Sequence, residues 1–208
     1  MRQLRLLLVT VIGLCIVGPA PIAGPSGDRM AASIADLILA DLNDPSLTEW
    51  MSPRNRELLE QAVQQGEITL AMYEESALEY RNCIAYLGTD TRWVQRPDGM
   101  YSENPPPEMD NAAMDQSSQN AFICAHAGFW VIESIFSLQL YNPGLYADQY
   151  QAIYVCIQSK GDFLNGLTLE EFREELRAQM SSSLTPLSID PTIPEVHNCL
   201  LGNGIGLG

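Results

Sequence analysis

Apolar residues recur three and four positions apart along most of the chain, which is the period of an amphipathic helix. In the N-terminal half such stretches cover residues 31–43, 53–65 and 69–88. Ser52 precedes the second stretch, and a serine there can accept hydrogen bonds from the first free N–H groups of a helix. We therefore expect three helices in this half, each with one apolar side packed on the rest of the protein.

Four more helices are predicted in the C-terminal half. They cover residues 114–140, 145–160, 168–180 and 190–201. The first is the longest and most apolar, so it is expected to be the central element of the core. In the third, Thr168 and Glu171 have the spacing of a capping box, in which each side chain binds the backbone N–H of the other residue.

The stretch between residues 88 and 112 does not follow the helical period. Trp93 and Tyr101 belong to two short strand-like runs, and the sequence between them, Arg96-Pro97-Asp98-Gly99, is typical of a turn. The sequence thus predicts a mainly α fold, a bundle of about seven helices with one small β-hairpin.

Residues 1–23 have the features of a signal peptide: two arginines, an apolar run, and a stretch rich in proline, alanine and glycine. The apolar run is shorter than the roughly 20 residues of a membrane-spanning helix. We expect cleavage, with no transmembrane anchor afterwards. Cys15 follows the bulky Leu14, whereas a lipidated cysteine usually follows a small residue.

Four cysteines remain after the signal peptide, an even number that favours two disulfides in an oxidising compartment. Four cysteines allow three pairings, and an internal repeat favours one of them. The helix with Cys83 matches the helix with Cys156 at a constant offset, and a second cysteine, Cys124 or Cys199, follows each at a similar distance. We expect the pairs Cys83–Cys124 and Cys156–Cys199.

These pairs define the predicted organisation of the mature chain. Residues 24–208 are expected to form a single helical domain with a lead-in, 31–65, and two Cys-linked units, 66–141 and 144–201, that share one core.

Acidic residues outnumber basic ones by 26 to 11, and the formal net charge is −15. Such a chain repels phosphates, so nucleic acid is not an expected partner. No phosphate-binding loop, dinucleotide fingerprint or nucleophile elbow is present, and no cofactor is expected. His126 and His197 each lie two residues from a cysteine, which raises the alternative of a zinc site. Zinc-binding cysteines usually come in closely spaced pairs, however, so we favour disulfides and expect no metal.

Several helix stops and spaced cysteines form a recognisable set between roughly residues 50 and 201. They are Gly66, Glu67, Ile68, Thr69, Tyr73, Glu74, Cys83, Gly88, Cys124, His126, Glu133, Cys156, Gly161, Leu167 to Phe172, Cys199 and Leu200. This set, which contains no catalytic signature, resembles a family of exported proteins and lipoproteins of actinobacteria. The resemblance implies a helical, disulfide-linked envelope or secreted protein, and the family has no assigned activity.

One acidic residue, Glu133, interrupts the most apolar run of the chain. A partly buried carboxyl group there could act as a general acid, with His126 seven residues earlier on the same helix face as its partner. The alternative is that Glu133 faces solvent or makes one structural hydrogen bond. The other candidate binding residues are aromatic: Trp93, Tyr101 and Trp130.

Three functions follow from these observations. The favoured one is an exported, non-catalytic binding protein with an extracellular or cell-envelope partner. The second is a hydrolase-type enzyme that uses His126 and Glu133 as an acid–base pair under the Trp93 hairpin, and the third is a structural protein of the cell envelope.

Overall fold

The computed structural model describes residues 28–89, 91–104, 110–181 and 187–206. These residues form eight helices and one two-stranded antiparallel hairpin, so the predicted mainly α fold is confirmed. The predicted signal peptide, with Cys15, lies outside the described residues. The helices are α1 (Ile34–Leu42), α2 (Pro45–Thr48), α3 (Pro53–Gln65), α4 (Leu70–Tyr86), a helix made of three segments (α5, Asn111–Cys124; η1, Ala125–Phe129; α6, Trp130–Tyr141), α7 (Gln149–Lys160), α8 (Leu169–Ser181) and α9 (Pro194–Gly202).

Several helix ends lie where the sequence predicts them. The Ser52 side chain accepts a hydrogen bond from the N–H of Asn55, and α3 ends at Gly66, whose φ is +81°. The capping box of α8 forms as expected, with Glu171 accepting from both the backbone N–H and the hydroxyl of Thr168. The four-residue helix α2 was not predicted; it begins directly after the predicted 31–43 helix, with Asp44 as its N-cap and Pro45 as its first residue.

The prediction of one continuous helix over 114–140 is wrong. The chain makes a π-helical turn, η1, at which Gly128 has a φ of +111°. At this turn α3 docks on the helix, and its N-cap residue Ser52 donates its backbone N–H to the carbonyl oxygen of Ala127 at 2.9 Å. π-helical turns inside longer helices often occur at functional sites.

Helix α7 begins later than predicted, at Gln149, after Asp148 as N-cap. The chain before it turns at residues 143–144 and forms an isolated antiparallel bridge, Tyr146 with Arg29, beside which the N–H of Met30 donates to the carbonyl of Leu145 at 2.8 Å. The internal repeat therefore fails at Tyr146, which precedes α7, whereas its counterpart Tyr73 lies inside α4.

Both predicted disulfides are present. Cys83–Cys124 joins α4 to the end of α5, and Cys156–Cys199 joins α7 to α9. Two disulfides are consistent with an extracytoplasmic location, because they persist in oxidising compartments.

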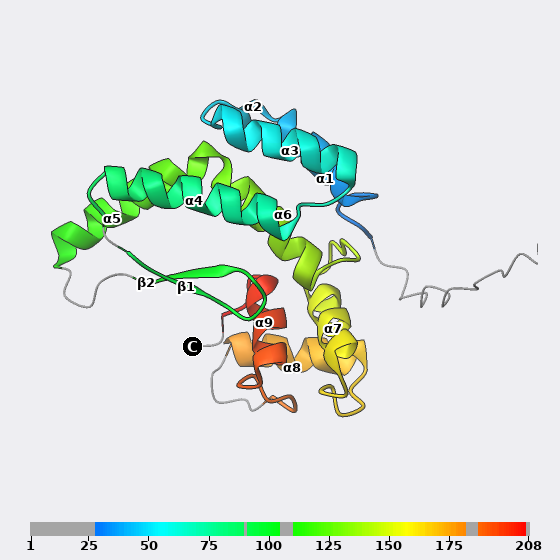
Figure 1. Ribbon diagram of the computed structural model, residues 1–208. Helices are drawn as coiled ribbons and strands as arrows, with labels where there is room; N and C mark the ends of the chain where they lie inside the picture. The colour runs from blue at the N-terminus through cyan, green and yellow to red at the C-terminus, as the bar shows by residue number, and fades with distance from the viewer. Residues whose placement is uncertain (1–27, 90, 105–109, 182–186, 207–208) are drawn as a thin grey trace, which may run out of the picture.

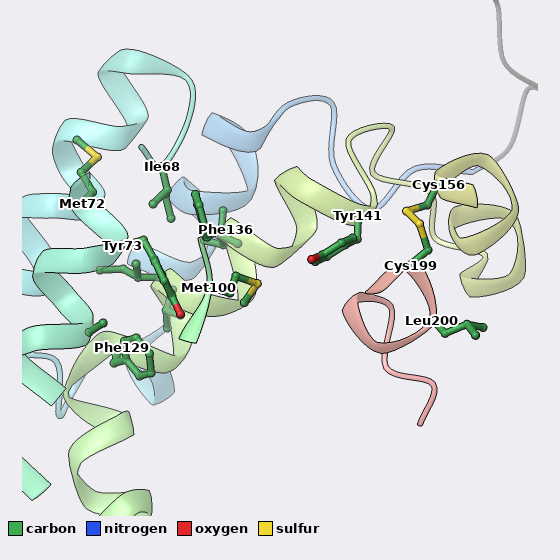
Figure 2. Close-up of a cluster of buried hydrophobic side chains, with 14 of the residues drawn as sticks. Ile68, Met72, Tyr73, Met100, Phe129, Phe136, Tyr141, Cys156, Cys199 and Leu200 are labelled. Carbon is green, nitrogen blue, oxygen red and sulfur yellow. A yellow bond between two sulfur atoms is a disulfide. The ribbon is translucent and has the colours of Figure 1, made fainter. Parts of the chain in front are cut away.

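The core is one cluster of buried apolar side chains centred on α6. This helix contacts α1, α4, α7 and α9. Figure 1 shows α1 to α3 along one side of the α4–α6 layer, with α7, α8 and α9 gathered near the C-terminal end of α6. In Figure 2, Tyr73 lies between Phe129 and Phe136, and its ring stacks on Phe136 with centroids 4.7 Å apart.

Within the described ranges, one helical segment, Asn111–Tyr141, is long and apolar enough to cross a membrane by length and composition. This is weak evidence for a membrane span, since the core helix of a soluble protein has the same character. Ile132 and Ile135 of this segment are 1% exposed in the protein's own core.

Candidate functional site

The candidate site lies beneath the β-hairpin, which is formed by β1 (Arg92–Gln95) and β2 (Tyr101–Asn104). Figure 1 shows the hairpin running beside α4 toward α9. Trp93 pairs with Glu103 across the two strands. Because side chains alternate along a strand, these two residues share one hairpin face with Tyr101, and this face meets α4. Val94 lies on the opposite face and is 46% exposed.

Two tyrosines of α4 hold the hairpin in place. The backbone N–H of Tyr101 donates to the hydroxyl oxygen of Tyr73 at 2.9 Å, and the hydroxyl of Tyr80 donates to Glu103 Oε2 at 2.9 Å. These tyrosines are two turns apart on one face of α4, so together they align the second strand with the helix. The predicted apolar stripe of α4 thus also positions the hairpin.

Aromatic side chains from three elements enclose a cavity of about 270 Å³ between the hairpin, α4 and the helix break. The Tyr80 ring lies 5.3 Å from Trp93 and 4.6 Å from Phe129, measured between ring centroids. Tyr101 and Trp130 complete the set. We call this space the aromatic cavity and define it by Tyr80, Trp93, Tyr101, Phe129 and Trp130, with Glu103 and Glu133 as its acidic residues.

A second cavity of about 470 Å³ adjoins the aromatic cavity and is bordered by α6, the hairpin turn and the end of α9. Its lining includes Arg96, Met100 and Tyr141, whereas Trp130 and Glu133 line both cavities. These two shared residues place the cavities side by side, and we call the pair the hairpin groove. Trp130 is 51% exposed, so the groove is open to solvent.

Polar side chains close the far end of the hairpin groove. The Arg96 guanidinium donates to Asp98 and, at 3.1 Å, to the hydroxyl oxygen of Tyr141, which in turn donates to Asp98. Burial alone would raise the pKa of Asp98, but the Tyr141 hydroxyl, the N–H of Met100 and the Arg96 guanidinium hold that pKa below its usual value. The positive charge of Arg96 is therefore largely matched by Asp98.

Glu133 projects from α6 between the two cavities. Desolvation by burial, together with the nearby negative charge of Glu103, raises its pKa to about 7, and Arg96 acts weakly in the opposite direction. Among the described residues, no side chain or backbone group forms a hydrogen bond with the Glu133 carboxyl group. The fold thus holds a half-buried acid that is free to meet a ligand.

His126 does not join Glu133. It lines a separate, almost wholly apolar cavity of about 390 Å³ with Trp50, Phe122 and Ile123. Its Nδ1 donates to the carbonyl oxygen of Phe122 at 2.9 Å, and the His126 and Trp130 ring centroids are 5.3 Å apart.

The prediction that His126 and Glu133 share one helix face is therefore wrong. Seven residues make almost two turns of a regular α-helix, but a π-helical turn takes more residues per turn and Gly128 within it has a non-helical φ, so the regular angular spacing between the two residues is lost. The break rotates Glu133 toward the hairpin and leaves His126 on the other side of Trp130.

The four predicted disulfide cysteines are occupied in their two bonds. Within the ranges that the structure describes, no group of three or more histidine, cysteine, aspartate or glutamate side chains could hold a metal ion. The zinc site considered from the sequence would need thiolates that the disulfides have consumed.

Sequence reasoning found Trp93, Tyr101, Trp130 and Glu133 but missed three other groups of the site. Tyr80 was predicted only as a core residue, and Phe129 and Glu103 were not singled out. In a hairpin centred on Asp98, residues equally far from Asp98 on the two strands lie opposite each other, and Glu103 then lies opposite Trp93. The turn sequence could therefore have identified Glu103 as a neighbour of Trp93.

In comparisons with known proteins, no family model, no curated protein and no solved structure matches this chain.

Proposed function

We propose that this chain is an exported, non-catalytic binding protein that holds a small organic ligand in the hairpin groove. The observation that carries the proposal is the aromatic cavity, in which five rings and an acid without a hydrogen-bond partner in the described chain surround open space. Ligand sites are typically concave, mostly apolar and supplied with a few polar groups, and the groove has this character.

Binding is favoured over catalysis because the groove does not bring together the predicted acid–base pair of His126 and Glu133. His126, the predicted partner of Glu133, lines a different cavity. The charged neighbours that act on Glu133 are Glu103 and Arg96, and Arg96 is already engaged with Asp98. Glu103, the second carboxyl group of the cavity, already accepts a hydrogen bond from Tyr80, whereas the Glu133 carboxyl group is available to orient a ligand.

Export is supported by the signal-peptide features of residues 1–23, by the two disulfides and by the acidic composition. The resemblance to exported actinobacterial proteins points to the same compartment. The experiment is to fuse residues 1–30 to a reporter enzyme that is active only outside the cytoplasm. Activity supports export, and a reporter that stays inactive and full-length inside the cell overturns it.

The three tryptophans of the chain provide a direct test of the groove. Trp93 and Trp130 line it, whereas Trp50 is 69% exposed and lies outside it. The purified mature chain, labelled with ¹⁵N, is mixed with a library of small organic compounds grouped by charge and polarity. A ligand of the groove shifts the indole N–H signals of Trp93 and Trp130 and leaves that of Trp50 unchanged. If compounds move only the Trp50 signal, or if no compound moves any, the proposal is wrong.

A further inference from the structure

We infer that the ligand of the hairpin groove is an organic cation whose ammonium group, preferably a quaternary one, occupies the aromatic cavity. This inference rests on the proposed function and adds the chemical class of the ligand.

The aromatic rings supply the first argument. The face of an aromatic ring carries partial negative charge and attracts a cation within about 6 Å of its centre. Tyr80, Trp93 and Phe129 come from α4, the hairpin and the helix break, and all three line the cavity, where Tyr80 stacks on Phe129 and both meet Trp93 edge-on. Trp93 already attracts one cation in the free protein, because the Arg81 guanidinium carbon lies 5.6 Å from its ring centroid.

The carboxyl groups supply the second argument. Glu103 and Glu133 line the same cavity, and the negative charge of Glu103 adds to burial in raising the pKa of Glu133. Tyr80 donates one hydrogen bond to Glu103, and Arg96 acts on Glu133 while bound to Asp98. A cation placed between the two acids would relieve their repulsion, whereas an anion would add to it. A neutral ligand would leave the repulsion unchanged.

The size of the groove supplies the third argument. Pockets for whole drug-sized ligands usually have about 300 to 1,000 Å³, so the aromatic cavity of about 270 Å³ suits a head group. The adjoining cavity of about 470 Å³ has Met100 and Leu138 beside Ser134 and Ser137, which suits a mixed apolar and polar body. An ammonium group followed by a short organic chain matches this division.

The probe pair is choline and 3,3-dimethyl-1-butanol, in which a carbon atom replaces the quaternary nitrogen. The two molecules have nearly the same shape and differ in charge. We expect choline to shift the Trp93 and Trp130 indole signals at pH 8 and to bind at least about tenfold more tightly than the neutral analogue, as a desolvated cation–π and ion-pair contact predicts. Glu133→Gln should weaken choline binding about tenfold without changing binding of the alcohol. Glu60→Gln, at an exposed position of α3, should change neither.

The outcomes separate the inference from the proposed function. Equal binding of choline and the alcohol overturns the cationic ligand but leaves the groove as a binding site. The same holds when choline fails to bind while other library compounds move the Trp93 and Trp130 signals. If no compound of any class moves these signals, the proposed function and the inference both fail.

Discussion

Asn55 Nδ2 donates a 2.8 Å hydrogen bond to the carbonyl oxygen of Ala127, 72 residues away in the sequence. The bond joins the first turn of α3 to the π-helical turn η1, where the α-helical hydrogen-bond pattern is interrupted. Ser52 supplies a second donor to the same oxygen at 2.9 Å. Helix α3 thereby fixes where the long helix breaks, and the break directs Phe129 and Trp130 into the hairpin groove.

Gly128 is the residue that makes this break possible. Its φ of +111° strains any residue with a Cβ atom, and a Cβ atom there would lie 2.7 Å from Asn55 Cβ. We expect Gly128→Ala to reduce the free energy of unfolding by about 2 to 4 kcal/mol, through strain and overpacking together. Urea denaturation followed by circular dichroism measures the change.

Gly166 offers a matched control for this substitution. Its φ is +80°, but no atom lies within 4 Å of a Cβ placed there. Gly166→Ala should therefore lower the free energy of unfolding by only about 1 kcal/mol. Equal losses in the two variants would show that the contact with Asn55 contributes nothing.

Local sequence signals predicted the helix ends and the hairpin but not the break. Ser52, Gly66 and Thr168 act on backbone groups within a few residues, so their roles can be recognised in the sequence. Residues 125–129 continue an apolar helical pattern, and a single glycine does not end a helix by itself. The contacts that hold the break come from Asn55 and Ser52, which are distant in the sequence and which no local pattern connects to it.

The same reasoning explains which parts of the site were predicted. The apolar surroundings of Glu133 and the aromatic hairpin are visible in the sequence, and both lie in the groove. The expected partnership of Glu133 with His126 depended on a regular helix between them, so it failed with that helix.

Glu133 should make the stability of the protein depend on pH. Its pKa in the folded protein is about 7, raised mainly by burial, from an ordinary value of 4.5. The free energy of unfolding therefore falls between about pH 4.5 and pH 7, where the unfolded chain has released this proton and the folded protein still holds it. This group has no effect on stability below that range, and its effect levels off above it. Glu103 and Arg96 are the charged groups that act on it, with opposite signs.

Glu133→Gln removes this ionisation. We expect the variant to be more stable than the wild type at pH 8 by about 1 to 2 kcal/mol, after allowance for partial exposure, and the two to converge near pH 4.5. Urea denaturation at the two pH values gives the difference, with Glu60→Gln as the control. A constant difference between the variant and the wild type across this range would contradict the raised pKa.

The two disulfides should contribute similarly to stability but differently to the groove. They close loops of 41 and 43 residues, and a cross-link of that span stabilises a fold by about 4 kcal/mol in the chain-entropy description. One double variant carries Cys83→Ala and Cys124→Ala, and the other carries Cys156→Ala and Cys199→Ala. We expect each to lower the free energy of unfolding by about 3 to 4 kcal/mol, measured by urea denaturation.

The indole N–H signals should distinguish the two double variants. Cys83 lies one turn from Tyr80 on α4, and Cys124 immediately precedes η1, so this disulfide ties together two walls of the aromatic cavity. Its removal should shift or broaden the Trp93 and Trp130 signals. Removal of the α7–α9 disulfide should leave the Trp93 signal in place. If both double variants shift this signal equally, the Cys83–Cys124 disulfide has no special role in holding the aromatic cavity.

Tyr141 should hold the turn of the hairpin on α6. Its hydroxyl donates to Asp98 and accepts from Arg96, and Asp98 in turn accepts from the backbone N–H of Met100. Tyr141→Phe keeps the packing of the ring but leaves two partly buried polar groups without this partner. We expect the free energy of unfolding to fall by about 1 to 2 kcal/mol and hydrogen exchange at the Met100 and Arg96 amides to become faster.

A comparable tyrosine away from the hairpin provides the control for this effect. The hydroxyl of Tyr154 donates to the carbonyl oxygen of Leu167 at 2.9 Å, between α7 and the start of α8. Tyr154→Phe should cause a similar loss of stability without changing exchange at Met100, because its hydrogen bond involves neither the hairpin nor α6. If both variants accelerate exchange in the hairpin equally, the turn is not held by Tyr141, and the closed end of the groove depends on global stability alone.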